Sequence, residues 1–284
     1  MKIAVSGSTG FIGSALIPSL AAEGHTVVRV PRSPEVSGFE GVEGAIHLAG
    51  EPIIGRWSEQ KKQRIRDSRA HGTRRLSEAL AHLSQPPKVL VTASAIGFYG
   101  DRGEEILEEH STQGSGFLAE VCRQWEAAAD PARRRGIRVV HVRIGVVLSP
   151  VGGALKLMLP PFQCGLGGVL GSGRQYMSWI ALDDILGGML HALTRETLQG
   201  PVNLVAPNPV TNREFTKTLG RVLSRPTIVP VPSFALRVLM GQMAEEVLLS
   251  SARVRPARLL DTGYVFRYPT LEPALRHLFG KISS

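Results

Sequence analysis

Short apolar runs alternate with amphipathic stretches along the first 150 residues of the chain. Apolar runs at 2–6, 26–30, 44–48, 88–92 and 137–142 predict strands, and amphipathic stretches at 11–23, 58–83 and 116–129 predict helices. Runs such as KVLVTA and IRVVHV are mainly apolar, which is typical of parallel strands covered on both faces. The alternation therefore predicts an α/β fold built on a doubly wound parallel sheet.

The pattern changes after Pro150. The segment 159–173, LPPFQCGLGGVLGSG, is rich in glycine and proline and has no clean period, so we predict a loop or lid there. We expect a sheet domain at 1–150 and a smaller, substrate-facing part at 151–284 that includes this lid region and a return to the sheet.

Composition and charge narrow the classes of function. No apolar run approaches the ~18 residues that span a bilayer, and no leader segment is evident, so we expect a cytoplasmic protein with no membrane partner. Cys122 and Cys164 lack the spacing of a disulfide framework or a metal site, and we predict no metal. The net charge of +9 is compatible with a solvated helix face, a phosphorylated ligand or nucleic acid. Because no nucleic-acid motif accompanies it, we expect no nucleic-acid partner.

A glycine-rich loop follows the first predicted strand. In AVSGSTGFIGSAL, three glycines stand between that strand and the next helix, where they permit a tight turn and bring backbone N–H groups to a pyrophosphate. This placement predicts a dinucleotide site in a Rossmann-type domain. The residues that we expect to contact the dinucleotide here are Gly7, Thr9, Gly10, Phe11, Ile12 and Gly13.

The end of the second predicted strand bears on the choice of coenzyme. An acid that binds the adenosine ribose of NAD is expected about 20 residues beyond the loop. This chain has RVPRSP there, with Arg32 and Ser33 in place of an acid. A guanidinium matches a 2′-phosphate, so we predict NADP(H) as the cofactor, the alternative being that Arg32 is an exposed loop residue.

Several motifs carry a family resemblance. The glycine spacing, HLAG at 47–50, SAIGFYG at 94–100 and GSGRQYMSWIALDDI at 171–185 resemble the extended short-chain dehydrogenase/reductase family. WEAAA, LPPF, GLGG and the tail from 255 to 275 resemble its atypical subgroup of epimerase family proteins, which end in a small C-terminal domain of unknown function and are sometimes linked to cell division. The resemblance implies further cofactor contacts at Leu48, Ala49, Gly50, Arg69, Ala93, Ser94 and Val146. Leu48, Ala49 and Val146 are equally compatible with a role in the core.

The catalytic pair of the wider family is missing. That family carries Tyr-x-x-x-Lys on the helix after YG, and the resemblance places Leu118 and Cys122 at those positions, or Phe117 and Val121 with a shift of one residue. The family's serine position falls on Ala95, next to Ser94. The catalytic residue therefore stays unassigned, with Ser94 and Tyr99 as the candidate hydroxyls.

Two substrate anchors of nucleotide-sugar enzymes are also replaced. The resemblance places Val146 where those enzymes have an asparagine and Met177 where they have an arginine for the diphosphate. We therefore expect an unknown, smaller and more apolar substrate and not a nucleotide sugar.

The remaining titratable residues have structural interpretations. We interpret His47 as a packing residue, Asp183 and Asp184 as acids at a helix start, and Cys122 as a buried, inert thiol, and leave Glu51 open between a pocket role and a capping role.

Two functional hypotheses remain. The first is an NADP-dependent oxidoreductase or epimerase-like enzyme of atypical mechanism. The second is an NADPH-binding sensor or scaffold with little turnover.

Overall fold

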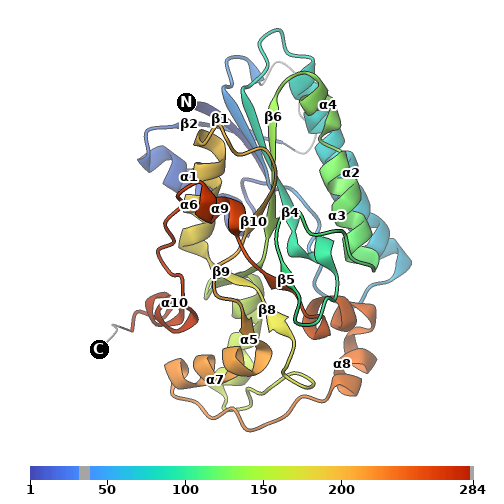
Figure 1. Cartoon of the computed structure of the whole chain (residues 1–284), viewed down its shortest axis with the longest axis vertical. Coiled ribbons are helices and arrows are strands. Elements are labelled where there is room, and N and C mark those ends of the chain that lie inside the picture. Colours follow the sequence, from blue (N-terminus) through green and yellow to red (C-terminus); the bar gives the residue numbers. More distant parts are fainter. Residues whose placement is uncertain (32–38, 282–284) are drawn as a thin grey trace.

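Six parallel strands form the central sheet of the structure, a computed structural model that describes residues 1–31 and 39–281 (Figure 1). The strands lie in the order β10-β6-β4-β3-β1-β2, and every neighbouring pair is parallel. Their bounds are β1 Lys2–Ser6, β2 Thr26–Val30, β3 Gly44–His47, β4 Val89–Ala95, β6 Arg138–Ile144 and β10 Gly200–Leu204. The predicted α/β fold with a doubly wound parallel sheet is confirmed.

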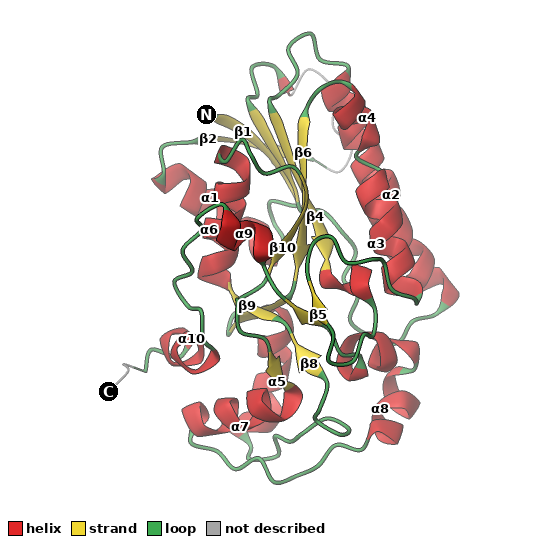
Figure 2. Cartoon of the chain, in the orientation of Figure 1, coloured by secondary structure: helices red, strands yellow, loops and turns green. Residues whose placement is uncertain are grey.

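Helices cover both faces of this sheet (Figure 2). On one face lie α1 (Phe11–Ala22) and α6 (Leu182–Thr194), whose apolar residues join the strands in one core cluster. On the other face lie α2 (Glu59–Ala81), α3 (Phe117–Ala127) and α4 (Asp130–Arg134), and α2 and α4 contribute to a second cluster. Since both faces are covered, β4 and β6 are buried along nearly their whole length, as their apolar runs predict.

The elements after residue 150 divide between the sheet and a smaller layer at its lower end in Figure 1. β10 joins the edge of the sheet, and α6 packs on one of its faces. Short strands outside the central sheet, before and after residue 150, are β5 Ile106–Leu107, β7 Val146–Ser149, β8 Tyr176–Met177, β9 Trp179–Ala181, β11 Val210–Thr211 and β12 Arg253–Val254. The further helical elements are η2 Ile96–Tyr99, α5 Gly153–Gln163, α7 Asn212–Leu223, α8 Ser233–Met240, η3 Ala244–Leu249, α9 Ala257–Asp261 and α10 Leu271–Leu278.

The predicted loop or lid at 159–173 is wrong for its first five residues. These residues end helix α5, although Pro160 and Pro161 lie inside it. The reason is packing: Leu155, Leu159 and Phe162 recur at helical spacing and are buried in the cluster with β9 and α7. Burial of this face offsets the hydrogen bonds that the two prolines remove.

Asp184 differs from its expected role at the start of α6. It is fully buried, and the N-cap of α6 has no side-chain hydrogen bond. Its carboxylate instead accepts hydrogen bonds from the backbone N–H of Arg267 at 2.7 Å and of Tyr268 at 2.9 Å. Asp184 therefore attaches the C-terminal segment to α6.

No helix in the described part of the chain has both the length and the apolar surface that a bilayer crossing requires.

Like Asp184, Glu246 forms hydrogen bonds with a distant part of the chain, in this case with the start of α3. The N-cap residue, Gly116, has no side chain and a φ of +109°, which a glycine adopts readily. The carboxylate of Glu246, in η3, accepts hydrogen bonds from the first two N–H groups of α3, at 3.0 Å from Phe117 and 2.8 Å from Leu118. The C-terminal segment thus caps a helix that lies 129 residues earlier in the chain.

Replacing Glu246 with alanine is expected to lower the free energy of unfolding by about 0.5–2 kcal/mol, because two N–H groups lose their acceptor and the helix dipole loses its anion. Urea denaturation followed by circular dichroism measures the change. Glu245→Ala is the matched control, since Glu245 forms an ion pair with the exposed Arg237 and this pair adds little to the free energy of unfolding. Equal losses for both variants would contradict the capping role.

Candidate functional site

The strand order places a switch point between β1 and β3. β1 pairs with β2 on one side and β3 on the other, so the loops after β1 and β3 leave the same edge of the sheet in opposite directions. Open α/β sheets bind ligands at such points. We use "switch point" for the two loops at 7–10 and 48–50.

The two loops of the switch point touch through their backbones. Gly7 has a φ of +72°, and a Cβ on it would lie 2.7 Å from the backbone nitrogen of Ala49 and from the carbonyl carbon of Leu48. A Cβ on Gly13 would lie 2.2 Å from the carbonyl oxygen of Gly7. Only glycine fits at both positions, and the backbone is left free to approach a ligand.

The start of α1 suits an anion. Its N-cap, Gly10, makes no side-chain hydrogen bond, and its first turn contains no acid. The first turn of the helix therefore offers its own N–H groups no carboxylate, which fits a pyrophosphate. Thr9 is exposed at this end, Ile12 packs on the core, and the Phe11 ring packs against Gly152, where a Cβ would lie 2.2 Å away.

His47, at the end of β3, is a packing residue. It is buried, and its Nδ1 makes a hydrogen bond with the Ser6 hydroxyl. Burial lowers the pKa of His47 to about 4, so the imidazole is neutral at pH 7.

Arg69 reaches the switch point from α2. A Cβ on Gly50 would lie 3.5 Å from the Cζ of its guanidinium. Its Nη1 donates hydrogen bonds to the carbonyl oxygens of Glu51 at 2.9 Å and Ile65 at 3.2 Å. Its Cζ lies 4.9 Å from the centre of the Trp125 ring on α3. The structure therefore brings together Arg69 and Gly50, two of the predicted cofactor residues.

Glu51 faces the cations of α2. Its carboxylate lies 2.8 Å from the Nζ of Lys61 and 3.6 Å from the Nε of Arg64. The hydrogen bond from Lys61 lowers the pKa of Glu51. Ion pairing with α2 is neither the pocket role nor the capping role between which the sequence leaves Glu51 open.

Ser94, near the end of β4, is bound to a buried ion pair. Its hydroxyl donates a hydrogen bond to the Oε1 of Glu126 at 2.7 Å. The same carboxylate accepts from the Nε and Nη2 of Arg143, at 2.8 and 2.9 Å. Since Ser94 is almost completely buried and its one proton is engaged, its hydroxyl has no proton for a substrate in this arrangement.

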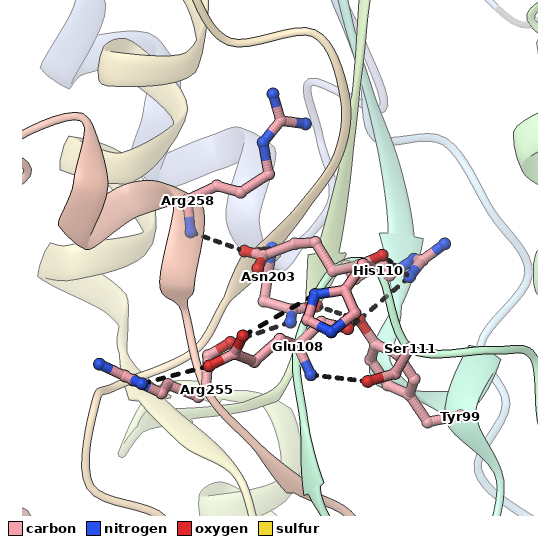
Figure 3. A network of polar contacts seen from close by, with 9 residues as sticks. Tyr99, Glu108, His110, Ser111, Asn203, Arg255 and Arg258 are labelled. Atoms are coloured by element: carbon pink, nitrogen blue, oxygen red, sulfur yellow. Dashed lines mark hydrogen bonds and ion pairs between the residues drawn. The ribbon is translucent and has the colours of Figure 1, made fainter.

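Tyr99 is the other candidate hydroxyl, and Figure 3 shows the polar network around it. The residue is fully buried, and its Oη lies 2.7 Å from the Oδ1 of Asn203 and accepts a hydrogen bond from the Nη1 of Arg143 at 3.0 Å. Burial raises the pKa of Tyr99. These contacts place Tyr99 in a structural role.

The helix α3 carries apolar groups where the wider family has its Tyr-Lys pair. A Cβ on Gly97 would lie 3.3 Å from the Cβ of Leu118 and 3.9 Å from the Sγ of Cys122, so both residues face the turn after β4. Leu118 packs in a cluster with Trp57 and with C-terminal residues such as Met243. Burial raises the pKa of the Cys122 thiol to about 12, which makes it a poor nucleophile at pH 7.

The remaining predicted residues lie at the edges of the site or outside the described chain. Ala93 is buried in β4, and Val146 is partly buried against the cluster around β9. Met177 packs on the same cluster, with its Sδ 3.5 Å from the Nδ2 of Asn212. Arg32 and Ser33 lie outside the described residues.

Sequence reasoning missed the roles of three residues. Arg143 and Glu126 form the buried ion pair that binds Ser94, and Glu246 caps α3. Arg143 in the strand β6, where the residues on both sides of it are apolar, was the available signal, because a buried guanidinium requires a partner.

Comparisons with known proteins show which family models and relatives the chain matches. The family model described as NAD dependent epimerase/dehydratase family matches residues 3–205, and the model described as Domain of unknown function (DUF1731) matches residues 231–278. An epimerase family protein of Mycobacterium tuberculosis is 43% identical over 96% of both chains.

Two solved structures are also similar. The crystal structure of human epimerase family protein SDR39U1 (isoform2) with NADPH is 36% identical, covers 99% of this chain and 100% of its own, and has a TM-score of 0.92. The nucleoside-diphosphate sugar epimerase of Corynebacterium glutamicum is 37% identical with a TM-score of 0.83, and the match covers 99% of this chain and 58% of that one.

Proposed function

Since the chain belongs to the NAD dependent epimerase/dehydratase family, we propose that it binds NADP(H) at the switch point and acts on a small molecule as an oxidoreductase or epimerase-like enzyme. The observation that carries the proposal is the contact between the two loops, in which Gly7 and Gly13 leave no room for a side chain. Gly10 and the N–H groups at the start of α1 hold the pyrophosphate, and Leu48, Ala49 and Gly50 lie beside it.

The preference for the 2′-phosphate comes from Arg32 and Ser33. A guanidinium binds a phosphate with two parallel hydrogen bonds, and no acid stands at the end of β2 to repel it. The NADPH in the crystal structure of the human relative supports this choice.

When bound, the nicotinamide supplies a hydride donor or acceptor. Because the hydroxyls of Ser94 and Tyr99 are engaged in buried contacts, we propose that water exchanges the proton with the substrate. Val146 and Met177 offer no charge to a diphosphate, so we propose a small, mainly apolar substrate and not a nucleotide sugar. We place this activity in the cytoplasm, with no membrane or nucleic-acid partner.

A second candidate function is an NADPH-binding sensor or scaffold without significant turnover. It is favoured by one observation: the helix that carries the acid and base in the wider family has Leu118 and a buried, protonated Cys122 there. Following NADPH oxidation and the formation of stereoisomers across a panel of small carbonyl compounds separates the two functions, because an epimerase-like reaction regenerates its coenzyme and gives no net oxidation of NADPH. Turnover of any of them supports the enzyme, and persistent absence of turnover supports the sensor.

The wild-type protein is expected to bind NADPH about 10- to 100-fold more tightly than NADH, because a 2′-phosphate adds charge-assisted hydrogen bonds worth about 1.5–3 kcal/mol. Arg32→Asp is expected to reverse this order, since a carboxylate repels the phosphate and accepts hydrogen bonds from ribose hydroxyls. Quenching of tryptophan fluorescence measures both dissociation constants.

Arg29→Asp is the matched control, because Arg29 is exposed on β2, three residues before Arg32 in the sequence, and the substitution changes the charge equally. Equal affinities for the two coenzymes before and after Arg32→Asp would overturn the 2′-phosphate assignment. Absence of binding to either coenzyme by folded wild-type protein would overturn the proposed function itself.

A further inference from the structure

The smaller layer at the lower end of Figure 1 carries an excess of positive charge. Residues 151–175 and 207–240 contain seven lysines and arginines and a single acid, Glu214, whose carboxylate is engaged at the start of α7. Arg221 and Arg237 form ion pairs with Glu272 and Glu245. The other five cations are exposed and have no carboxylate within 4 Å among the described residues: Lys156, Arg174, Arg213, Lys217 and Arg225.

Three of these cations form a row along α7. Arg213 and Lys217 lie four residues apart on one face of the helix, and Arg225 follows two residues after its end. Each donates a hydrogen bond to a backbone carbonyl oxygen in one of two neighbouring segments: Arg213 to Ser172, Lys217 to Thr227, and Arg225 to Gln163. Because carbonyl oxygens carry no net charge, the row stays positive. We call Arg213, Lys217 and Arg225 the basic edge.

The segments that the basic edge contacts expose apolar side chains. They run side by side, since the N–H of Val231 donates to Val169 at 3.0 Å and the N–H of Gly171 donates to Val231 at 2.8 Å. The helix α8 follows after Pro232, and its apolar residues continue the same surface; Ile228 is 79% exposed and Val238 is 71% exposed. The exposed residues that we call the apolar strip are Leu166, Ile228, Val229, Phe234, Val238 and Leu239. An apolar surface with a polar rim is typical of an interaction site.

The charge of the basic edge limits what can cover the strip. A second copy of the chain, docked symmetrically, would present the same surface and bring like charges together. Nucleic acid has the required negative charge, but its bases stack on aromatic rings, and Phe234 is the one aromatic residue of the strip. The charge therefore favours an acidic partner that also carries apolar groups.

The backbone of the strip favours a polypeptide over a lipid. Within residues 1–31 and 39–281, the N–H and C=O groups of Ile228 take part in no hydrogen bond. Hydrocarbon offers them no partner, so inserting the Ile228 side chain into a bilayer would leave both groups unpaired. An extended polypeptide supplies a carbonyl oxygen and an N–H group, as a strand does when it adds to an exposed edge.

We propose that the apolar strip and the basic edge together bind an extended, acidic segment of a partner protein. The backbone of that segment pairs with Ile228, its apolar side chains pack on the strip, and its carboxylates face Arg213, Lys217 and Arg225. This inference goes beyond the proposed function, because the surface forms without the coenzyme and needs no turnover.

A peptide of alternating leucine and glutamate, about eight residues long and labelled with a fluorophore, is the probe. Fluorescence anisotropy at about 0.15 M salt measures its binding. We expect the wild-type protein to bind it, and Arg213→Glu combined with Lys217→Glu to weaken binding by at least about 10-fold, because two attractive charges become repulsive. The matched control is Arg29→Glu combined with Arg134→Glu, an equal change of charge at exposed positions on β2 and α4, and we expect wild-type affinity.

Two further measurements test the apolar and backbone contacts. We expect Ile228→Ser to weaken peptide binding by about 3- to 10-fold, through the loss of a buried aliphatic side chain, and Val265→Ser, at an equally exposed position near the C-terminus, to leave it unchanged. Methylation of every second backbone nitrogen of the peptide is expected to abolish binding, because the N–H groups that pair with Ile228 are lost.

Several outcomes would overturn the inference. Failure of the folded wild-type protein to bind the peptide would do so, as would equal binding of the peptide by wild type, the basic-edge variant and Ile228→Ser. Binding of phosphatidylserine vesicles or of a single-stranded oligonucleotide, without binding of the peptide, would assign the surface to a lipid or to nucleic acid instead. Titration of NADPH into the same variants keeps the two proposals separate, since we expect all of them to bind it as the wild type does.

Discussion

Replacing Glu126 with alanine is expected to lower the free energy of unfolding by about 3–5 kcal/mol. The carboxylate of Glu126 accepts hydrogen bonds from both the Nε and the Nη2 of Arg143, whose side chain is 4% exposed. Without the carboxylate, the Arg143 guanidinium stays buried and loses its counter-charge. The hydroxyl of Ser94 loses its acceptor as well. The loss is therefore larger than the direct energy of the ion pair.

Two further variants test this explanation by urea denaturation. Glu120→Ala removes an acid from an exposed ion pair with Arg123 on the same helix, and we expect a change within about 1 kcal/mol. Glu126→Leu combined with Arg143→Met removes both charges, and we expect a smaller loss than for Glu126→Ala alone. If the double variant were as unstable as Glu126→Ala or less stable, an unpaired buried charge would not be the cause.

Five strands of the sheet and the helices α1, α2 and α3 were predictable because each of these strands is a mainly apolar run and each of these helices has apolar residues at helical spacing. The start of α2 is an example: the Ser58 hydroxyl accepts the N–H of Lys61 at 3.2 Å, a local capping signal. The helix α5 was not predictable in the same way. Its two prolines argue against a helix locally, and only burial of Leu155, Leu159 and Phe162 by distant elements decides the outcome.

The candidate site also has a part that the sequence predicts and a part that depends on contacts between distant elements. The glycines at 7, 10 and 13 were predictable because they follow one another along the chain, and the turn that they form is local. The engagement of the Ser94 hydroxyl depends on Glu126 and on Arg143, which come from a helix and a different strand. Since no local pattern records such a contact, the sequence leaves Ser94 as a candidate for catalysis, and only the fold shows that its proton is engaged.

Gly13→Ala is expected to weaken NADPH binding by at least about 100-fold, the effect of losing two charge-assisted hydrogen bonds of about 1.5–3 kcal/mol each. The added methyl group would lie 2.2 Å from the carbonyl oxygen of Gly7 and 3.0 Å from the Cα of Ser8. Both atoms belong to the backbone of the loop, so no side-chain rotation relieves the overlap. The loop must move away from α1, which separates the N–H groups that bind the pyrophosphate.

Gly72→Ala is the matched control, because Gly72 lies inside α2 and its added methyl group would meet only the Nε2 of His47, at 4.0 Å. We expect this variant to bind NADPH as the wild type does and to be more stable by about 0.5–1 kcal/mol, since alanine favours the helix. Tryptophan fluorescence titration and urea denaturation measure the two effects separately. If Gly13→Ala were folded and still bound NADPH as Gly72→Ala does, the loop could not be the phosphate cradle, because its backbone geometry would then have no bearing on the ligand.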